Sequence, residues 1–320
     1  MAATVSSCSR TIAAIGAARA VEFGAYVLHE GAMRDALVAA ARRGADVRVT
    51  LQRDPYADDG DEAPANAAAA ALLRAAGAHV TLLAREAVPF HCKAAVCDGV
   101  AFLDDRNWPR DGGLVLRDDD ARDVALVESA LRGEGGDDGV LATRKDDALA
   151  REVALIDATP AATPLVVASE AFGPGQVAQA LMRRAARGGT TTLLIDEHEL
   201  DAERRRAVDA LARAGVRIRN DDAGEKFVLA GDRAWIGSAN ATYAGGERAD
   251  QIEWALVTAV PEVLDAVRAA AAGSARTARA GPASGRSRPA SGAVPCSRGA
   301  PPDPSSGWLS SRRAAAARSS

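Results

Sequence analysis

Two stretches of this sequence decide the fold: HCKAAVCDGVAFLDDRN at residues 91–107 and GEKFVLAGDRAWIGSAN at residues 224–240. In each stretch an asparagine follows 14 residues after a lysine (Lys93 or Lys226), and the offset between the two stretches is 133 residues. Apolar and polar residues alternate after each lysine, which predicts a hairpin of two short strands. The matching spacing indicates an internal duplication.

The sequence upstream of each stretch repeats in the same sense. Residues 21–51 predict a strand, a helix and a strand, and residues 165–195 predict the same order. Gly44 and Gly188 follow the two helices, where a left-handed C-cap is usual. Alternating strands and helices predict an α/β fold. We expect two similar α/β halves, each a mixed, largely parallel sheet covered by helices, that meet along one interface.

The predicted boundaries are residues 1–143 for the first half, 144–274 for the second half and 275–320 for a tail. The tail consists mainly of Gly, Pro, Ser, Ala and Arg, and it cannot bury enough apolar surface to offset the entropy of ordering. It carries eight arginines and one acid, a charge of +7, whereas the whole chain is −4, so residues 1–274 carry about −11. A body this acidic disfavours stable binding of nucleic acid.

The cysteines, Cys8, Cys92, Cys97 and Cys296, show no paired spacing, which favours a reducing compartment. The N-terminal residues lack the pattern of a signal peptide, and no stretch has the apolar length of a membrane span. We therefore expect a cytoplasmic protein without a transmembrane segment. No cofactor is expected, and a metal site is disfavoured because strand alternation places the candidate ligands around residue 91 on different faces.

The first stretch carries residues suited to phosphoryl chemistry. Residues two apart in a strand share a face, so His91 and Lys93 can point together at one ligand. Imidazole can attack phosphorus and form a covalent phosphohistidine, and an ammonium group offers charge and donors to phosphoryl oxygens. Asp98 completes the pattern HxKxxxxD, and Asn107 follows it. This pattern resembles the signature of the phospholipase D superfamily.

The resemblance implies a phosphodiesterase or phosphatidyl-type transferase that acts on a phosphodiester such as a phospholipid through a phosphohistidine. It implies that His91 is the nucleophile, that Lys93 is catalytic, and that Asp98 supports the histidine of the other copy. The amide of Asn107 would donate to a phosphoryl oxygen. The second copy would add three residues to the phosphate site, which are Lys226, Ser238 and Asn240.

The second copy departs from the pattern, because Gly224 replaces its histidine and Gly231 its aspartate. The usual family mechanism needs two histidines, so three hypotheses follow: a substitute acid, a homodimer that brings two copies of His91 together, or a phosphoryl-binding or scaffold protein without turnover. A nuclease is a further alternative, which the acidic body opposes. We place His29 and Glu30, which follow a predicted strand, at the rim of the pocket as candidate acids. Glu253 resembles an acid found downstream of the family motif.

Overall fold

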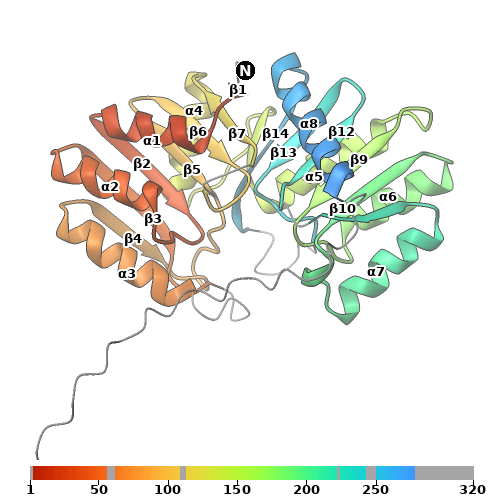
Figure 1. The fold of residues 1–320 in the computed structure, drawn as a ribbon, viewed down its shortest axis with the longest axis horizontal. Coiled ribbons are helices and arrows are strands. Elements are labelled where there is room, and N and C mark those ends of the chain that lie inside the picture. Colours follow the sequence, from red (N-terminus) through yellow and green to blue (C-terminus); the bar gives the residue numbers. More distant parts are fainter. Residues whose placement is uncertain (1–2, 56–61, 109–112, 222–223, 243–249, 278–320) are drawn as a thin grey trace, which may run out of the picture. The chain divides into compact units, whose positions relative to one another are not determined.

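Two seven-stranded sheets form the framework of the chain (Figure 1). The computed structural model describes residues 3–55, 62–108, 113–221, 224–242 and 250–277. These residues fall within one unit, Met1–Gly281. The tail predicted at residues 275–320 lies almost wholly outside the described residues.

The first half contains these elements in chain order: β1 (Thr4–Val5), α1 (Cys8–Ala17), β2 (Ala20–Ala25), α2 (Ala32–Arg42), β3 (Asp46–Gln52), α3 (Glu62–Ala75), β4 (His79–Leu83), β5 (Ala94–Cys97), β6 (Val100–Asp104), β7 (Val115–Asp118) and α4 (Ala121–Leu131). Ser7 and Asp120 cap α1 and α4 through side-chain oxygens that accept backbone N–H groups. The predicted strand–helix–strand unit is β2–α2–β3.

The second half contains β8 (Leu141–Arg144), α5 (Lys145–Ala158), β9 (Leu165–Ser169), α6 (Gln176–Ala186), β10 (Thr191–Ile195), η1 (Glu197–Glu199), α7 (Ala202–Arg213), β11 (Arg217–Asn220), β12 (Phe227–Ala230), β13 (Arg233–Gly237), β14 (Ile252–Thr258) and α8 (Pro261–Thr277). Strand β8 pairs with β14, so the second half begins before the predicted boundary at residue 144. Helix α8 likewise continues beyond the predicted end at residue 274.

The two sheets have equivalent strand orders. Read from the corresponding edge, they are β1-β7-β6-β5-β2-β3-β4 and β8-β14-β13-β12-β9-β10-β11. In each sheet the first strand of the strand–helix–strand unit lies beside the first strand of the hairpin. The prediction of two similar halves with mixed sheets is confirmed. Parallel pairing is limited to β2, β3 and β4 in one sheet and β9, β10 and β11 in the other, because the hairpins add antiparallel strands.

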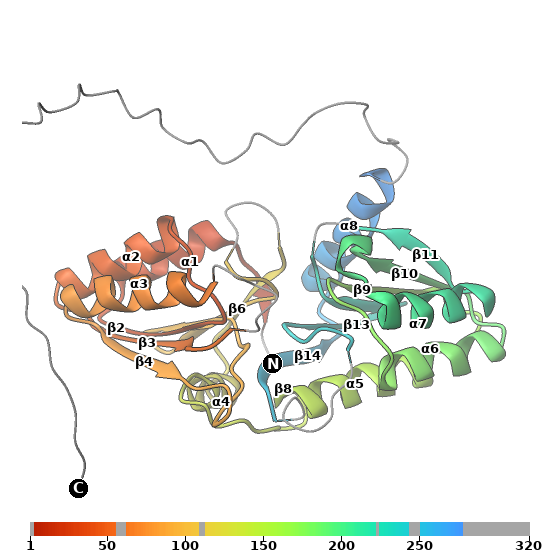
Figure 2. The ribbon, with the colours of Figure 1, turned by 90° about the horizontal axis from the view of Figure 1, so that it is seen from below.

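Helices cover both faces of each sheet. Helices α1–α3 lie on one face of the first sheet and α4 on the other, as seen in Figure 2. Helix α4 also contacts β8 and β14 of the second sheet, and α8 contacts β1 of the first as well as β12 and β13. No helix in the described part of the chain combines the length and apolarity needed to cross a membrane.

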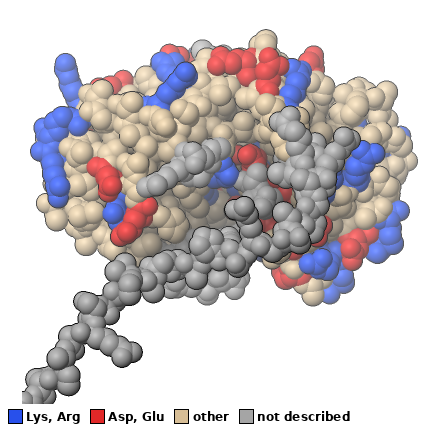
Figure 3. All heavy atoms as spheres, viewed as in Figure 1, with Lys and Arg blue, Asp and Glu red and all other residues tan. Residues whose placement is uncertain are grey.

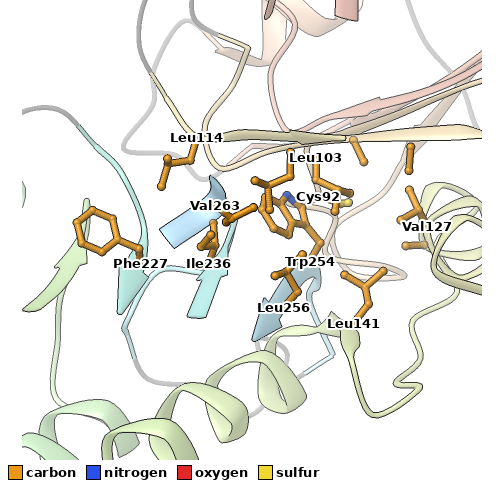
Figure 4. Packing of buried hydrophobic residues seen from close by; sticks show 14 of the residues in the cluster. Cys92, Leu103, Leu114, Val127, Leu141, Phe227, Ile236, Trp254, Leu256 and Val263 are labelled. Atoms are coloured by element: carbon orange, nitrogen blue, oxygen red, sulfur yellow. The ribbon is translucent and has the colours of Figure 1, made fainter. Parts of the chain in front are cut away.

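A shared hydrophobic core joins the two halves. It contains buried side chains from both hairpins and from α4 and α8, and Figure 4 shows the Trp254 indole between Cys92 and Leu103 of the first half and Leu256 of the second. The indole N–H donates to the backbone carbonyl of Asp104 at 2.8 Å, so the ring is buried without an unpaired polar atom. Replacing a buried tryptophan by alanine lowers the free energy of unfolding by about 3–5 kcal/mol. The packing of Trp254 therefore helps to hold the two halves together.

Candidate active site

His91 is positioned by a short bridge between the two halves. Its backbone N–H donates to the carbonyl of Ile252 at 2.8 Å, and the N–H of Ile252 donates to Pro89 at 2.8 Å. Because Glu253 follows Ile252, this bridge brings the Glu253 carboxylate to 3.0 Å from His91 Nδ1. Glu253 is 1% exposed, and the His91 side chain keeps 14% of its surface accessible. The imidazole therefore faces an opening, with a buried carboxylate behind it.

The carboxylate fixes which ring nitrogen carries the proton. Burial would raise the pKa of Glu253, but the hydrogen bond from His91 and the charge of Lys93 hold it below its usual value. An ionised carboxylate only accepts hydrogen bonds, so the ring proton lies on Nδ1 and leaves a lone pair on Nε2. Burial lowers the pKa of His91, and Lys93 adds to this effect. The ring is thus neutral near neutral pH, as a nucleophile requires.

The Lys93 ammonium lies directly beside this ring. Its Nζ lies against the ring edge, 2.7 Å from His91 Nδ1 and 2.8 Å from Nε2, and it donates to the backbone carbonyl of His91 at 2.8 Å. Burial lowers the pKa of Lys93 to about 8, which leaves it charged at neutral pH. The ring of Tyr26 closes the other side, with its centroid 4.8 Å from that of His91 and 5.6 Å from Lys93 Nζ.

Lys226 reaches the same site from the second half. Its Nζ is 2.9 Å from the Glu170 carboxylate and donates to the backbone carbonyl of Asp105 at 3.1 Å. Burial would lower the pKa of Lys226, but Glu170 and Asp105 raise it. The charge of Lys226 in turn lowers the pKa of His91 and of Lys93. Cations from both halves therefore contribute to the electrostatic potential at the imidazole.

Ser238 lies behind the histidine and not on phosphate. The side chain is fully buried, and its hydroxyl donates to Glu253 at 2.6 Å while accepting the N–H of Trp254 at 3.0 Å. Both functions of the hydroxyl are used, so the prediction that Ser238 binds phosphate is wrong. Its role is to hold the Glu253 carboxylate against His91.

Asp98 also lies at a different place from the one that the sequence predicted. It lies in the exposed turn between β5 and β6 at φ 47°, and its carboxylate accepts the backbone N–H groups of Arg19 and Ala20 at 2.9–3.1 Å. These hydrogen bonds lower the pKa of Asp98. The residue caps the hairpin at the end away from His91. The prediction that Asp98 supports a catalytic histidine is therefore wrong, and Glu253 has that position.

His29 and Glu30 lie apart from the histidine cluster. Both are exposed, and Glu30 pairs with Arg34 at 3.3 Å. Together with Asn107 they line a small cavity of about 70 Å³. The carbonyl oxygen of Asn107 is buried there without a hydrogen-bond partner among the described residues. Neither His29 nor Glu30 contacts His91 within the described ranges, so the rim assignment is not supported, while phosphate binding by Asn107 stays a prediction.

The His91–Glu253 pair has no counterpart, because glycines stand at both equivalent positions, Gly224 for the histidine and Gly113 for the glutamate. Leu103 pairs with Leu116 as Ile236 pairs with Leu256, so Gly113 occupies the place that Glu253 has in the second half. The first half has lost the carboxylate, just as Gly224 marks the loss of the histidine.

The Arg106 side chain fills the space of this lost pair. A Cβ atom on Gly113 would lie 2.9 Å from Arg106 Nη2, and one on Gly224 would lie 3.4 Å from Arg106 Cδ. Gly224 also has φ 78°, a conformation that a histidine would adopt only with strain. One side chain with a permanent charge thus replaces a titratable pair.

Asn240 anchors the turn that carries Glu170. Its side-chain oxygen accepts the N–H of Ala171 at 3.1 Å, which fixes the backbone next to Glu170. The sequence singled out Asn240 but missed Glu170, Tyr26 and Arg106. Aligning the strands that begin the two repeats would have paired Glu170 with Tyr26 and drawn attention to both.

Comparison with known proteins bears on the fold. No protein-family model matches the chain, and no curated protein matches its sequence. Polyphosphate kinase from Porphyromonas gingivalis is similar in structure, with a TM-score of 0.58 and 15% identity over 82% of this chain and 47% of that one. Phosphatidylserine synthase from Haemophilus influenzae Rd KW20 has a TM-score of 0.57 and 12% identity over 85% of this chain and 84% of its own.

These identities establish the fold and leave the activity to the site itself. The chain spans about half the length of the polyphosphate kinase, 47%. The similarity to the phosphatidylserine synthase covers both halves together, as the internal duplication requires. The chain therefore has the duplicated phospholipase D-like α/β fold that its motif predicted.

Proposed function

We propose that this protein is a phosphoryl-transfer enzyme that cleaves a phosphodiester through a covalent phosphohistidine at His91. One observation carries the proposal: the Glu253 carboxylate lies 3.0 Å from His91 Nδ1, and the Lys93 ammonium lies at the same ring, 2.7 Å from Nδ1 and 2.8 Å from Nε2. The carboxylate offsets the charge that develops on the ring during attack. The ammonium lies where it can bind the phosphoryl oxygens and direct them toward Nε2.

The site needs both halves of one chain. Glu253 and Lys226 come from the second half and act on His91 of the first. We therefore propose that a single chain forms the reactive centre, and that a homodimer is not required to complete it. A phosphodiester carries one negative charge and suits a site where two lysines face one imidazole. Release to water gives a phosphodiesterase, and release to an alcohol gives a phosphatidyl-type transferase.

A second candidate is a protein that binds a phosphoryl group without turnover. The replacement of the second histidine by Gly224, with Arg106 in its space, favours this candidate. A nuclease is less consistent with the charge distribution, because Figure 3 shows acidic and basic side chains interspersed on the visible face. A DNA affinity that falls steeply with salt would favour the nuclease.

Trapping the covalent intermediate separates these candidates. We expect bis(p-nitrophenyl) phosphate to release one equivalent of p-nitrophenolate rapidly and leave a p-nitrophenylphosphoryl group on His91, detected by peptide mass spectrometry. His91→Asn must abolish the adduct. His29→Asn, which changes an exposed histidine outside the cluster, must retain it. Binding of the diester without any adduct in the native chain would reject the enzyme and leave the binding protein.

A further inference from the structure

Glu170 lies beside the position where the second half has Gly224 in place of a histidine. Ala95 pairs with Phe23 in the first sheet as Val228 pairs with Val167 in the second, so Glu170 matches Tyr26. Tyr26 packs against His91. In the same way Glu170 lies next to Gly224, and a Cβ atom on that glycine would be 3.8 Å from Glu170 Oε1. The carboxylate therefore faces the vacated histidine position.

This carboxylate belongs to the same electrostatic site as the nucleophile. Lys226 holds the pKa of Glu170 at about 2, and the charge of Lys93 also lowers it. The Glu170 side chain keeps 47% of its surface exposed, whereas the lysine paired with it is 1% exposed. Of the two partners, the carboxylate is the one that can move toward solvent or toward a ligand.

We infer that Glu170 carries the proton that a second histidine would otherwise carry, in the phosphoryl transfer proposed at His91. The inference rests on that proposed function. A phosphoryl anion that binds Lys226 competes with Glu170 for the same ammonium group. Glu170 then loses its ion pair and gains a negative neighbour, and both changes favour its protonated form. Substrate binding thus loads the proton where the leaving group needs it.

In this reaction Glu170 gives up one proton in the first chemical step and regains one in the second. In the first step His91 Nε2 attacks phosphorus, the bond from phosphorus to the leaving oxygen breaks, and Glu170 gives its proton to that oxygen. In the second step water attacks phosphorus, its proton passes to the Glu170 carboxylate, and the P–N bond breaks to restore neutral His91. Glu253 faces the cationic phosphohistidine between the steps.

Arg106 also lies at the Gly224 position, but it cannot supply the proton proposed for Glu170. The guanidinium occupies the space of the lost histidine and carboxylate, and it stays protonated throughout any reaction near neutral pH. It can stabilise negative charge but cannot donate a proton to a leaving group. Glu170, by contrast, is titratable, pairs with Lys226 at 2.9 Å and lies 3.8 Å from the Cβ position of Gly224.

The leaving group provides the test. A p-nitrophenolate departs without a proton, whereas phenolate departs far better with one, so bis(p-nitrophenyl) phosphate and diphenyl phosphate separate acid catalysis from binding. We expect Glu170→Gln to keep the first burst of p-nitrophenolate near the native rate. The same variant should slow diphenyl phosphate by about 10²–10⁴-fold in kcat, with KM unchanged or lower because Lys226 is released. After the burst, the variant should stall as the adduct, because water is no longer activated.

The control is Glu86→Gln, which removes an exposed carboxylate from its ion pair with Arg53 at 3.0 Å and must match the native chain on both diesters. Equal slowing of the first chemical step with both diesters by Glu170→Gln, or no slowing of that step with either, would overturn the role of Glu170 while leaving the phosphohistidine intact. A native chain that forms no adduct with the activated diester would defeat the proposed function itself, and the assignment of Glu170 with it.

Discussion

Replacing Glu253 by glutamine tests how the buried carboxylate prepares the nucleophile. The Ser238 hydroxyl accepts the N–H of Trp254, so its own proton must point at residue 253. In Glu253→Gln that proton will bind the amide oxygen and turn the amide NH2 group toward His91. An N–H group facing Nδ1 favours the tautomer with its proton on Nε2, which removes the lone pair that attacks phosphorus.

The expected loss follows from this geometry. A hydrogen bond to a charged group, such as the one at 3.0 Å between Glu253 and His91, contributes about 1.5–3 kcal/mol. At about 1.4 kcal/mol per factor of ten, its loss slows the first step by about 10–150-fold. The wrong tautomer adds to this, and in a comparable carboxylate–histidine pair the total is about 10⁴. We expect a loss on the order of 10²–10⁴-fold.

The assay is a single-turnover measurement of p-nitrophenolate release, together with nitrogen NMR of the imidazole to identify the tautomer. The matched control is Glu152→Gln, because Glu152 is equally buried, at 1% exposed, and its Oε2 has no hydrogen-bond partner within the described ranges. That variant should react at the native rate. A Glu253→Gln rate equal to the native one, with the proton still on Nδ1, would refute the reasoning.

Further predictions concern pH, stability and repair of the motif. Because the pKa of Lys93 is lowered to about 8, kcat/KM should fall as the pH rises through about 8, and this alkaline limb should disappear in Lys93→Arg. Because the pKa of His91 is also lowered, kcat/KM should stay constant at pH 6.5 and fall only at a pH below that value. Asp98→Asn should lower the melting temperature and leave the adduct rate unchanged, since this carboxylate caps a turn; a slower adduct would return it to the site. Burial raises the pKa of Glu152 from 4.5 to about 8, so the folded chain keeps a proton that the unfolded chain releases. Denaturant titrations should therefore show stability falling more steeply between those pH values in the native chain than in Glu152→Gln. Gly224→His should not increase turnover, because Arg106 fills the space and φ is 78°; a gain in rate would contradict that packing.

The sequence was enough to predict the duplicated architecture and to bring His91 and Lys93 together. Equal spacing within the two hairpins required two equivalent halves, and strand alternation placed His91 and Lys93 on one face. These are local properties, because the side-chain period of a strand and the length of a hairpin depend on residues close together in the chain.

Only the tertiary structure shows which other side chains surround His91. Glu253 is 162 residues from His91, and the two meet only because the bridge at Ile252 joins the halves. Spacing in the first motif pointed to Asp98, but a hairpin sends residues at its turn to the far end of the sheet. Ser238 faces inward for the same kind of reason, since the neighbouring strand β14 supplies its partners.

The replacement of the second histidine also required the fold. Arg106 and Gly113 lie in the connection between β6 and β7 and Glu170 follows β9, and no spacing rule connects them to Gly224. Their relation arises from the register of strands in two sheets and from the packing of one half on the other. Periodicity along the chain sets which face a residue occupies, whereas the partners across an interface depend on contacts between residues more than a hundred positions apart.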